Sequence, residues 1–195
     1  MSAQAEYQSC SHEVIGGLVE VVNIAVMDQF PTSRVDIDDV EDLLVALRTL
    51  RPKVDEFDLF IGFAQIVRGK FRDAADTFGT LVAKSLCMPD SRAMQVYCMS
   101  RNENSDWHIA ANELLESEQL TPVARTMILA VKARHEIVES KMTFLSTGEF
   151  VEPESLRILK EETQPDGILP AGYGMPTMHR EHDHMAVMQG QYMRL

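Results

Sequence analysis

The stretch GKFRDAADTF, from Gly69 to Phe78, has a degenerate second copy in this sequence, SDWHIAANEL, from Ser105 to Leu114. Each copy contains an aromatic residue, two variable residues, a pair of alanines and, four residues after the first alanine, a bulky apolar residue. The two aromatic residues, Phe71 and Trp107, lie 36 positions apart. A fixed interval of this length is typical of a repeated pair of helices. The sequence therefore predicts a helical repeat protein.

Helical patterns extend this prediction to most of the chain. Residues three and four positions apart share one face of an α-helix, and proline and glycine mark where helices stop. Seven segments carry such signals, namely residues 12–28, 36–51, 54–68, 71–85, 91–103, 106–118 and 122–145. Only a short turn around Gly69 separates the third segment from the fourth, which makes these two helices antiparallel neighbours. We therefore predict an all-α fold of antiparallel helical hairpins stacked as degenerate repeats.

Eight residues are predicted to form the structural core of these repeats. Small residues at a helix crossing let the two backbones approach, and an aromatic side chain fills the space beside the crossing. Glycine also suits the left-handed conformation at a helix end. The predicted repeat core consists of Gly62, Gly69, Phe71, Ala74, Phe78, Trp107, Ala110 and Leu114.

The first two helices carry further signals. One face of the first helix is predicted from the spacing of Val14, Leu18, Val21, Val22 and Ala25. The pair Gly16 and Gly17 in the same helix is expected to permit close helix packing, since no strand precedes it to form a phosphate-binding turn. Acidic residues crowd the range 36–42, where the partial positive charge of a helix N-terminus stabilises them, and a binding patch is the alternative interpretation.

The composition is that of an ordinary globular protein and excludes several function classes. The chain has 195 residues, of which 45% are hydrophobic and 25% charged, and its formal net charge is −12. Such an acidic chain is repelled by nucleic acid and by anionic membranes, so we expect neither as a partner. The three cysteines contain no CxxC pair, which argues against a disulfide framework and a thiolate zinc site.

The order of segments along the chain predicts four parts. The start of the chain lacks the basic and apolar stretches of a secretory signal, and no apolar run approaches the ~20 residues that cross a bilayer. We therefore expect a soluble, cytoplasmic chain without a transmembrane segment. Its predicted parts are a flexible N-terminus at 1–11, a helical-repeat domain at 12–150, a short helix within 151–163 and a flexible tail rich in Pro, Gly, Met and His at 164–195.

One cluster of histidines in the tail suggests a metal-binding or catalytic site. His179, His182 and His184 stand close together beside carboxylates and would suit a transition metal if the segment folded around it. Their spacing matches neither the HExxH helix nor a zinc finger, and prolines and glycines precede them. We therefore favour a solvated tail whose methionines offer adaptable partner contacts, with a metal-binding protein as the less favoured alternative. We predict no catalytic residue, no metal site and no cofactor, and hence no enzyme.

Four quoted stretches resemble a known family. LVEVV (residues 18–22), LRTLRP (47–52), FDLFIGFAQIVRGKFRDAADTF (57–78) and SRNENSDWHIAANELLE (100–116) look like the HrpB1/HrpK family of bacterial type III secretion proteins. The resemblance implies a tetratricopeptide-like fold and a role in assembling a virulence-associated secretion apparatus and its pilus. It also implies similarity in architecture to the YscG/PscG chaperones, which hold needle subunits before export.

The resemblance further implies where a protein partner would bind. Stacked hairpins of this kind accept an amphipathic helix in a concave groove, so the implied function is a non-catalytic chaperone or assembly factor for a needle or pilus subunit. In the repeat register the groove-lining residues would be Leu59, Phe63, Ile66, Val67 and Met99. Burial in the core is the alternative for these apolar residues. A general helical-repeat scaffold or regulatory protein outside secretion is the alternative function, and association with the secretion apparatus or a periplasmic location is the alternative to a purely cytoplasmic one.

Overall fold

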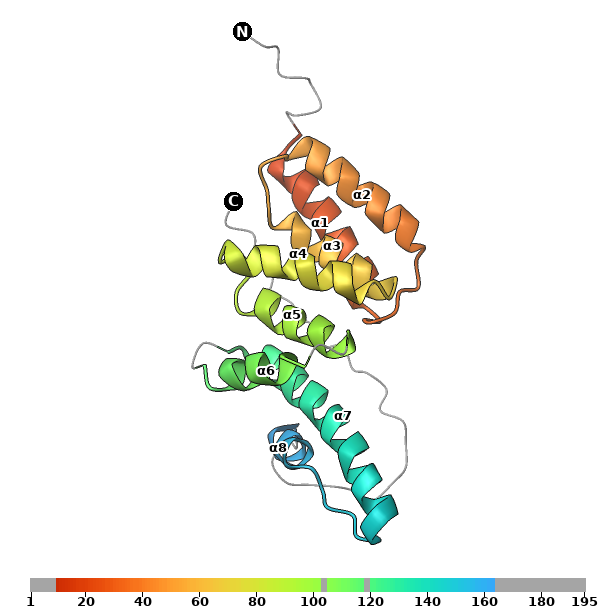
Figure 1. Ribbon diagram of the computed structural model, residues 1–195. Helices are drawn as coiled ribbons and strands as arrows, with labels where there is room; N and C mark the ends of the chain where they lie inside the picture. The colour runs from red at the N-terminus through yellow and green to blue at the C-terminus, as the bar shows by residue number, and fades with distance from the viewer. Residues whose placement is uncertain (1–9, 103–104, 118–119, 164–195) are drawn as a thin grey trace. The chain divides into compact units, whose positions relative to one another are not determined.

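The computed structural model describes residues 10–102, 105–117 and 120–163. Within these ranges the chain forms eight α-helices and no strand, which confirms the all-α fold (Figure 1). The helices are α1 (His12–Met27), α2 (Ile37–Leu50), α3 (Phe57–Val67), α4 (Phe71–Ala83), α5 (Asp90–Arg101), α6 (Trp107–Leu115), α7 (Pro122–Thr147) and α8 (Glu154–Thr163). The expectations for residues 1–9 and for the tail at 164–195 lie outside the described residues.

Side chains and turns set the helix ends. The backbone N–H of Val14 donates to Ser11 Oγ at 3.3 Å, which caps α1. The N–H of Asp38 donates to Asp36 Oδ1 at 3.0 Å, which caps α2. Helix α3 begins at Phe57 and not at Val54, because the segment before it forms tight turns, with Asp58 N–H donating to the Asp55 carbonyl at 3.0 Å. These end groups satisfy backbone donors that a helix cannot satisfy internally.

Consecutive helices pack against one another along the chain. Helix α2 packs on α1 and α3, α4 on α3 and α5, and α6 on α5, while α1 also contacts α3. The connection between α3 and α4 is very short and turns at Gly69, whose φ of +73° is in the left-handed region that glycine adopts without strain. This chain of neighbouring helices is consistent with a helical repeat fold.

The acidic start of α2 pairs with a cation from a distant part of the chain. The Arg68 guanidinium, at the end of α3, donates to both carboxylate oxygens of Glu41 at 2.7 and 3.1 Å and also bonds Asp38. Asp36 caps the same helix. The acidic residues in the range 36–42 therefore serve partly to cap α2 and partly to hold α2 against the α3–α4 turn.

The chain divides into two compact units, residues 1–132 and 133–195. In the first unit the α3–α4 hairpin is packed most tightly at Gly62, where a Cβ atom would lie only 2.5 Å from Cζ of the Phe78 ring. The Phe78 side chain is fully buried, as are Leu44 and Leu81 from the neighbouring part of the core. Only glycine at position 62 permits this approach of α3 to α4.

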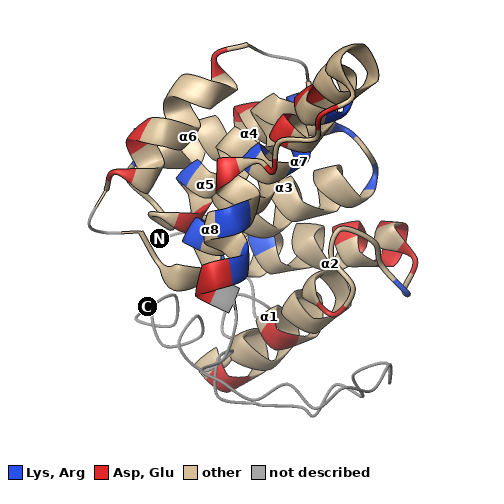
Figure 2. Cartoon of the chain, turned by 90° about the horizontal axis from the view of Figure 1, so that it is seen from below, with Lys and Arg blue, Asp and Glu red and all other residues tan. Residues whose placement is uncertain are grey.

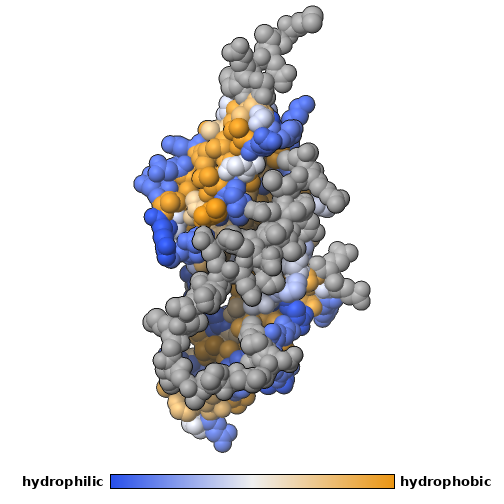
Figure 3. Space-filling view, turned by 180° about the vertical axis from the view of Figure 1, so that it is seen from behind, coloured by the Kyte–Doolittle hydropathy of each residue, from blue (hydrophilic) through white to orange (hydrophobic). Residues whose placement is uncertain are grey.

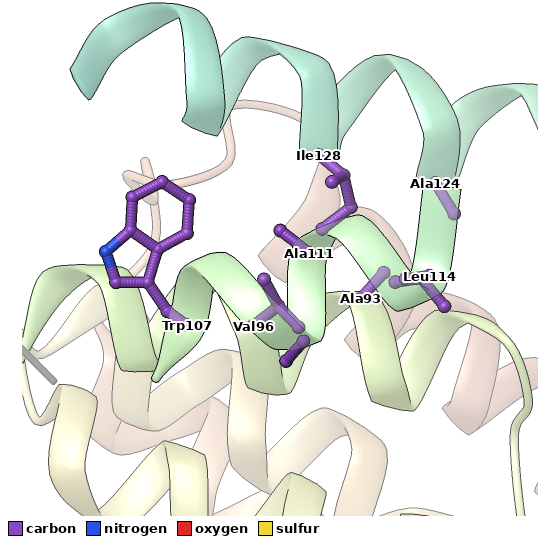
Figure 4. Packing of buried hydrophobic residues seen from close by; sticks show 8 residues of the cluster. Ala93, Val96, Trp107, Ala111, Leu114, Ala124 and Ile128 are labelled. Atoms are coloured by element: carbon purple, nitrogen blue, oxygen red, sulfur yellow. The ribbon is translucent and has the colours of Figure 1, made fainter. Parts of the chain in front are cut away.

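A second part of this core joins α5, α6 and the beginning of α7 (Figure 4). Its members are Ala93, Val96, Trp107, Ala110, Ala111, Leu114, Ala124 and Ile128. Small alanines alternate with larger side chains, so the helices can approach while Trp107 and Ile128 fill the space between them.

The second unit contains the end of α7 and α8. Ser155, at the first turn of α8, is buried and donates both its backbone N–H and its hydroxyl to the Glu136 carboxylate, at 3.0 and 2.7 Å. A carboxylate at a helix N-terminus satisfies free N–H groups and interacts favourably with the helix dipole. Glu136 therefore anchors the start of α8 to α7.

Candidate protein-binding surface

The five residues predicted to line a groove have different environments. Leu59, Phe63 and Ile66 of α3 are buried, whereas Val67 and Met99 are half-buried. Side chains with less than a tenth of their surface accessible have little area to offer a bound helix. In this structure the accessible part of the predicted groove is therefore limited to Val67 on α3 and Met99 on α5.

An aromatic side chain from the α1–α2 connection explains why Phe63 is buried. The Phe30 ring meets the Phe63 ring edge-on with centroids 5.5 Å apart, and Phe63 meets Phe78 in the same way at 5.7 Å. Phe30 also contacts Tyr97 of α5 at 6.4 Å. Nothing in the sequence pattern between the first two predicted helices places Phe30 over α3.

Met99 lies beside a surface hollow between α4 and α5. The hollow has a volume of about 390 Å³ and is lined by Arg72, Ala75, Asp76, Met99 and Asn102. A methionine beside a guanidinium and a carboxylate provides an apolar contact together with charges of both signs. Such a hollow suits one side chain of a protein partner better than a small organic ligand, which requires a mostly apolar pocket.

Aromatic residues support the helices around this hollow. The Phe71 and Tyr97 rings are 6.2 Å apart, and the Arg101 guanidinium carbon lies 4.9 Å from the centre of the Phe71 ring. Phe71 is half-buried, Gly69 is exposed, and the other six residues of the predicted repeat core are buried. The structure thus brings Phe71 and Met99 to neighbouring helices, and gives Phe71 a cation–π contact.

The largest departure from the expected pattern is on α1. Ile15, Val22 and Val26 are buried, whereas Val14 and Val21 are 51% and 54% exposed. Of the five residues predicted to share one face, Val22 is buried and Leu18 and Ala25 are half-buried, so the prediction was wrong at Val14 and Val21. Apolar residues occupy most of the α1 surface, and the spacing alone could not select the buried side.

The prediction for the glycine pair in α1 was also wrong at one of its two positions. A Cβ atom added to Gly17 would have no neighbour within 4 Å. Gly17 therefore makes no close helix contact in this chain and lies in open space on the exposed side of α1.

This exposed side of α1 is apolar in an acidic setting. Ile24 is 49% exposed, and it continues the line of Val14 and Val21 along the helix. Figure 3 shows apolar surface near the N-terminal end of the described chain, and Figure 2 shows acidic but no basic residues on α1. The acidic residues of the helix are Glu13 and Glu20, and Asp28 follows at its end.

The described residues offer little to catalysis or metal binding. The candidate cluster at His179, His182 and His184 lies outside them, and within them no group of three or more His, Cys, Asp or Glu residues could hold a metal ion. Burial raises the pKa of the Cys87 thiol to about 12, an effect to which Glu56 and Asp90 add, and burial alone raises that of Cys98 to about 12. Both thiols therefore stay protonated near neutral pH and are poor nucleophiles.

A second hollow, of about 480 Å³, lies in the unit at residues 133–195. It is lined by Glu136, Glu139, Ser140, Thr143, Val151, Glu152, Pro153 and Glu154. Glu136 is bonded to Ser155, and Glu152 is bonded to Lys160 at 2.5 Å. These pairings give two of its carboxylates a structural role.

Comparisons with known proteins add the last observations. A sequence model of the family described as bacterial type III secretion protein (HrpB1_HrpK) matches residues 5–137. No curated protein and no solved structure matches the chain. In the part of the chain that the structure describes, no helix has the length and apolar character needed to span a membrane.

Proposed function

Because the chain belongs to the HrpB1_HrpK family of bacterial type III secretion proteins, we propose that it is a non-catalytic chaperone or assembly factor for the secretion apparatus. Its client would be an amphipathic helix of a needle or pilus subunit. The observation that carries this proposal is the extent of the family match, which covers α1 to α6 and the start of α7. The cytoplasm, beside the apparatus, is the proposed location, and the periplasm is the alternative.

The packing of the helices supports a binding function. A stack of helices presents an extended surface to a partner, and an amphipathic helix can bury its apolar side there. We assign the client contact to the hollow between α4 and α5, with Met99 as its apolar contact, and we retain Val67 on α3 as the other accessible residue of the predicted groove. We further propose that the hairpins are degenerate tetratricopeptide-like repeats, since the aromatic and alanine pattern recurs in α4 and α6.

Charge favours a basic or neutral client. The chain carries a net charge of −12, which attracts basic partners and slows the approach of acidic ones. Arg72 and Asp76 line the same hollow as Met99, so a client side chain entering it would meet both a hydrogen-bond donor and a hydrogen-bond acceptor.

The test is affinity purification of the tagged, full-length chain from its own host under secretion-inducing conditions, followed by mass spectrometry. We expect a small helical needle or pilus subunit in stoichiometric amount. Met99→Asp should reduce its recovery at least tenfold, because a charge would replace the apolar contact of the hollow. Met142→Asp is the matched control, since Met142 is 65% exposed on α7. Recovery of no apparatus component would contradict the proposal and leave a helical-repeat scaffold outside secretion.

A further inference from the structure

The exposed apolar residues of α1 form one continuous face. Val14, Val21 and Ile24 are each about half exposed, and Gly17 and Leu18 fall between them at helical spacing. Residues three, four, seven and ten positions apart lie along the same side of an α-helix. We call this set of five residues the α1 face.

The position of α1 in the series of helices explains why this face is uncovered. Among the described helices, α3 packs closely against α1, α2 and α4, whereas the close packing partners of α1 are α2 and α3. The terminal helix of a helical array normally has a polar outer side, because no further helix covers it. A helix that is apolar on nearly all sides is normally buried. The α1 face is therefore as apolar as a buried helix surface, although it lies where the series of helices ends.

The charges around the face select what can cover it. Helix α1 contains no Lys or Arg, while Glu13 and Glu20 follow one edge of the face. Asp28 stands at its C-terminal end and pairs with the Arg34 guanidinium at 3.9 Å, so the negative charge that borders the face is that of Glu13 and Glu20. A second copy of this chain placed face to face, with its α1 antiparallel, would bring the two acidic edges together, which is electrostatically unfavourable. A helix with Lys or Arg along one edge of its apolar stripe can instead place these cations against the edge that carries Glu13 and Glu20.

The shape of the face also suits a helix. At 16 residues α1 is long enough for about four turns of a partner, at about 1.5 Å per residue. Gly17 has open space where a Cβ atom would be, so a partner backbone can approach α1 closely near the middle of the face.

We propose that the α1 face docks an amphipathic helix of another protein, with an apolar stripe of about four turns and with lysines or arginines along one edge of that stripe. This inference goes beyond the proposed function, because the α1 face and the hollow at Met99 share no residue. A chain with two such surfaces can hold two protein segments at once, and so connect them.

The test measures binding of a defined probe to the full-length chain by fluorescence anisotropy. The probe is a labelled 16-residue helix-forming peptide with leucines at helical spacing and lysines along one edge of the leucine stripe; the matched probe carries glutamates in place of the lysines. We expect the lysine peptide to bind at least tenfold more tightly at low salt. Val21→Ser with Ile24→Ser, and separately Gly17→Arg, should each weaken that binding at least tenfold.

Val45→Ser is the matched control, because Val45 is an exposed valine, 65% accessible, on α2 and outside the α1 face. It should leave peptide binding unchanged. Gly17→Arg removes no apolar contact, so its effect does not depend on loss of folding. Equal binding of both peptides, or equal weakening by Val45→Ser, would overturn the inference. A wild-type dimer in solution that becomes monomeric on Val21→Ser with Ile24→Ser would also overturn it, and would assign the face to a second copy.

The outcomes separate this inference from the proposed function. Met99→Asp should leave peptide binding intact, since Met99 is not part of the α1 face. If the lysine peptide does not bind while an apparatus subunit is still recovered from the host, the inference about α1 fails and the secretion function stands. If the peptide binds as described but no apparatus subunit is recovered, the function fails and the docking surface stands.

Discussion

Helices α3 and α1 are both rich in apolar residues but have opposite environments. In α3, Phe57, Leu59, Phe63 and Ile66 are all buried, whereas α1 leaves Val14, Val21 and Ile24 about half exposed. The difference lies in the neighbours, because α3 packs against helices on more sides than α1 does. Burial in a helical array thus depends on position in the series as much as on the sequence of a helix. The predictions below test this contrast between covered and uncovered positions.

The largest expected effect is on thiol reactivity. Cys98 is fully buried in α5 and its pKa is raised to about 12, whereas Cys10 just before α1 is partly accessible. With a maleimide reagent at pH 8, Cys98 should react more slowly than Cys10 by roughly a thousandfold or more, since its exposure requires unfolding. Mass spectrometry of the labelled peptides measures both rates. Fast labelling of Cys98 in the folded chain would contradict the described core, and Cys10→Ser should remove only the fast phase.

The next prediction compares the loss of a buried side chain with the loss of an exposed one. Phe78→Ala should lower the free energy of unfolding by about 3–5 kcal/mol, because the ring is fully buried against Gly62 and Phe63. Val21→Ala on the α1 face should change it by less than about 0.5 kcal/mol. Urea denaturation followed by circular dichroism measures both values. Similar losses for the two variants would mean that α1 is covered in the free chain.

Replacing either of two glycines by alanine is expected to change the stability of the chain in opposite directions. Gly62→Ala should destabilise the chain by about 1–3 kcal/mol, because the new methyl group would meet the buried Phe78 ring at 2.5 Å. Gly17→Ala should stabilise it by roughly 0.5–1 kcal/mol, since no atom lies within 4 Å and alanine favours the helix. The melting temperatures of the two variants, compared with that of the wild type, show whether each change stabilises or destabilises the chain. Destabilisation by Gly17→Ala would contradict an uncovered α1 face.

The smallest expected effect concerns an exposed ion pair. Lys84 donates to Asp55 Oδ2 at 2.8 Å, and this hydrogen bond and the lysine charge hold the pKa of Asp55 below its usual value. A lowered pKa in the folded state contributes stability at neutral pH that is lost as the pH falls through that pKa. Asp55→Asn should therefore be slightly less stable than the wild type at pH 7, with the difference narrowing below about pH 4. Lys84→Met should abolish the same pH dependence, and its persistence would exclude this pair as the cause.

The fold and the family were predictable from sequence because both rest on local patterns. Helical spacing and the stop signals at Pro52 and Gly69 depend on residues close together in the chain, and all seven helices predicted from them are present. The family prediction from the quoted motifs is likewise confirmed. Its motifs coincide with the helix-crossing positions, such as Gly62 and Phe78, where packing tolerates few residue types.

The surface was less predictable, because it depends on contacts between distant residues. Nothing in the α1–α2 connection signals that Phe30 reaches Phe63 and Tyr97, so the burial of Phe63 followed only from the structure. The spacing left Leu59 and Ile66 open to either a groove or the core, and the structure buries both. For α1, the usable signal was its narrow polar side, at Glu13 and Glu20, which leaves more apolar surface than the neighbouring helices bury.

Phe30 also has a mechanical consequence. It follows the last turn of α1 by only three residues, its N–H donates to the Met27 carbonyl at 3.4 Å, and its ring rests between α3 and α5. A partner that pulled or rotated the end of α1 would therefore move a ring that touches Tyr97, which in turn touches Phe71. We therefore expect a displacement of the end of α1 to reach α4 and α5 through these ring contacts.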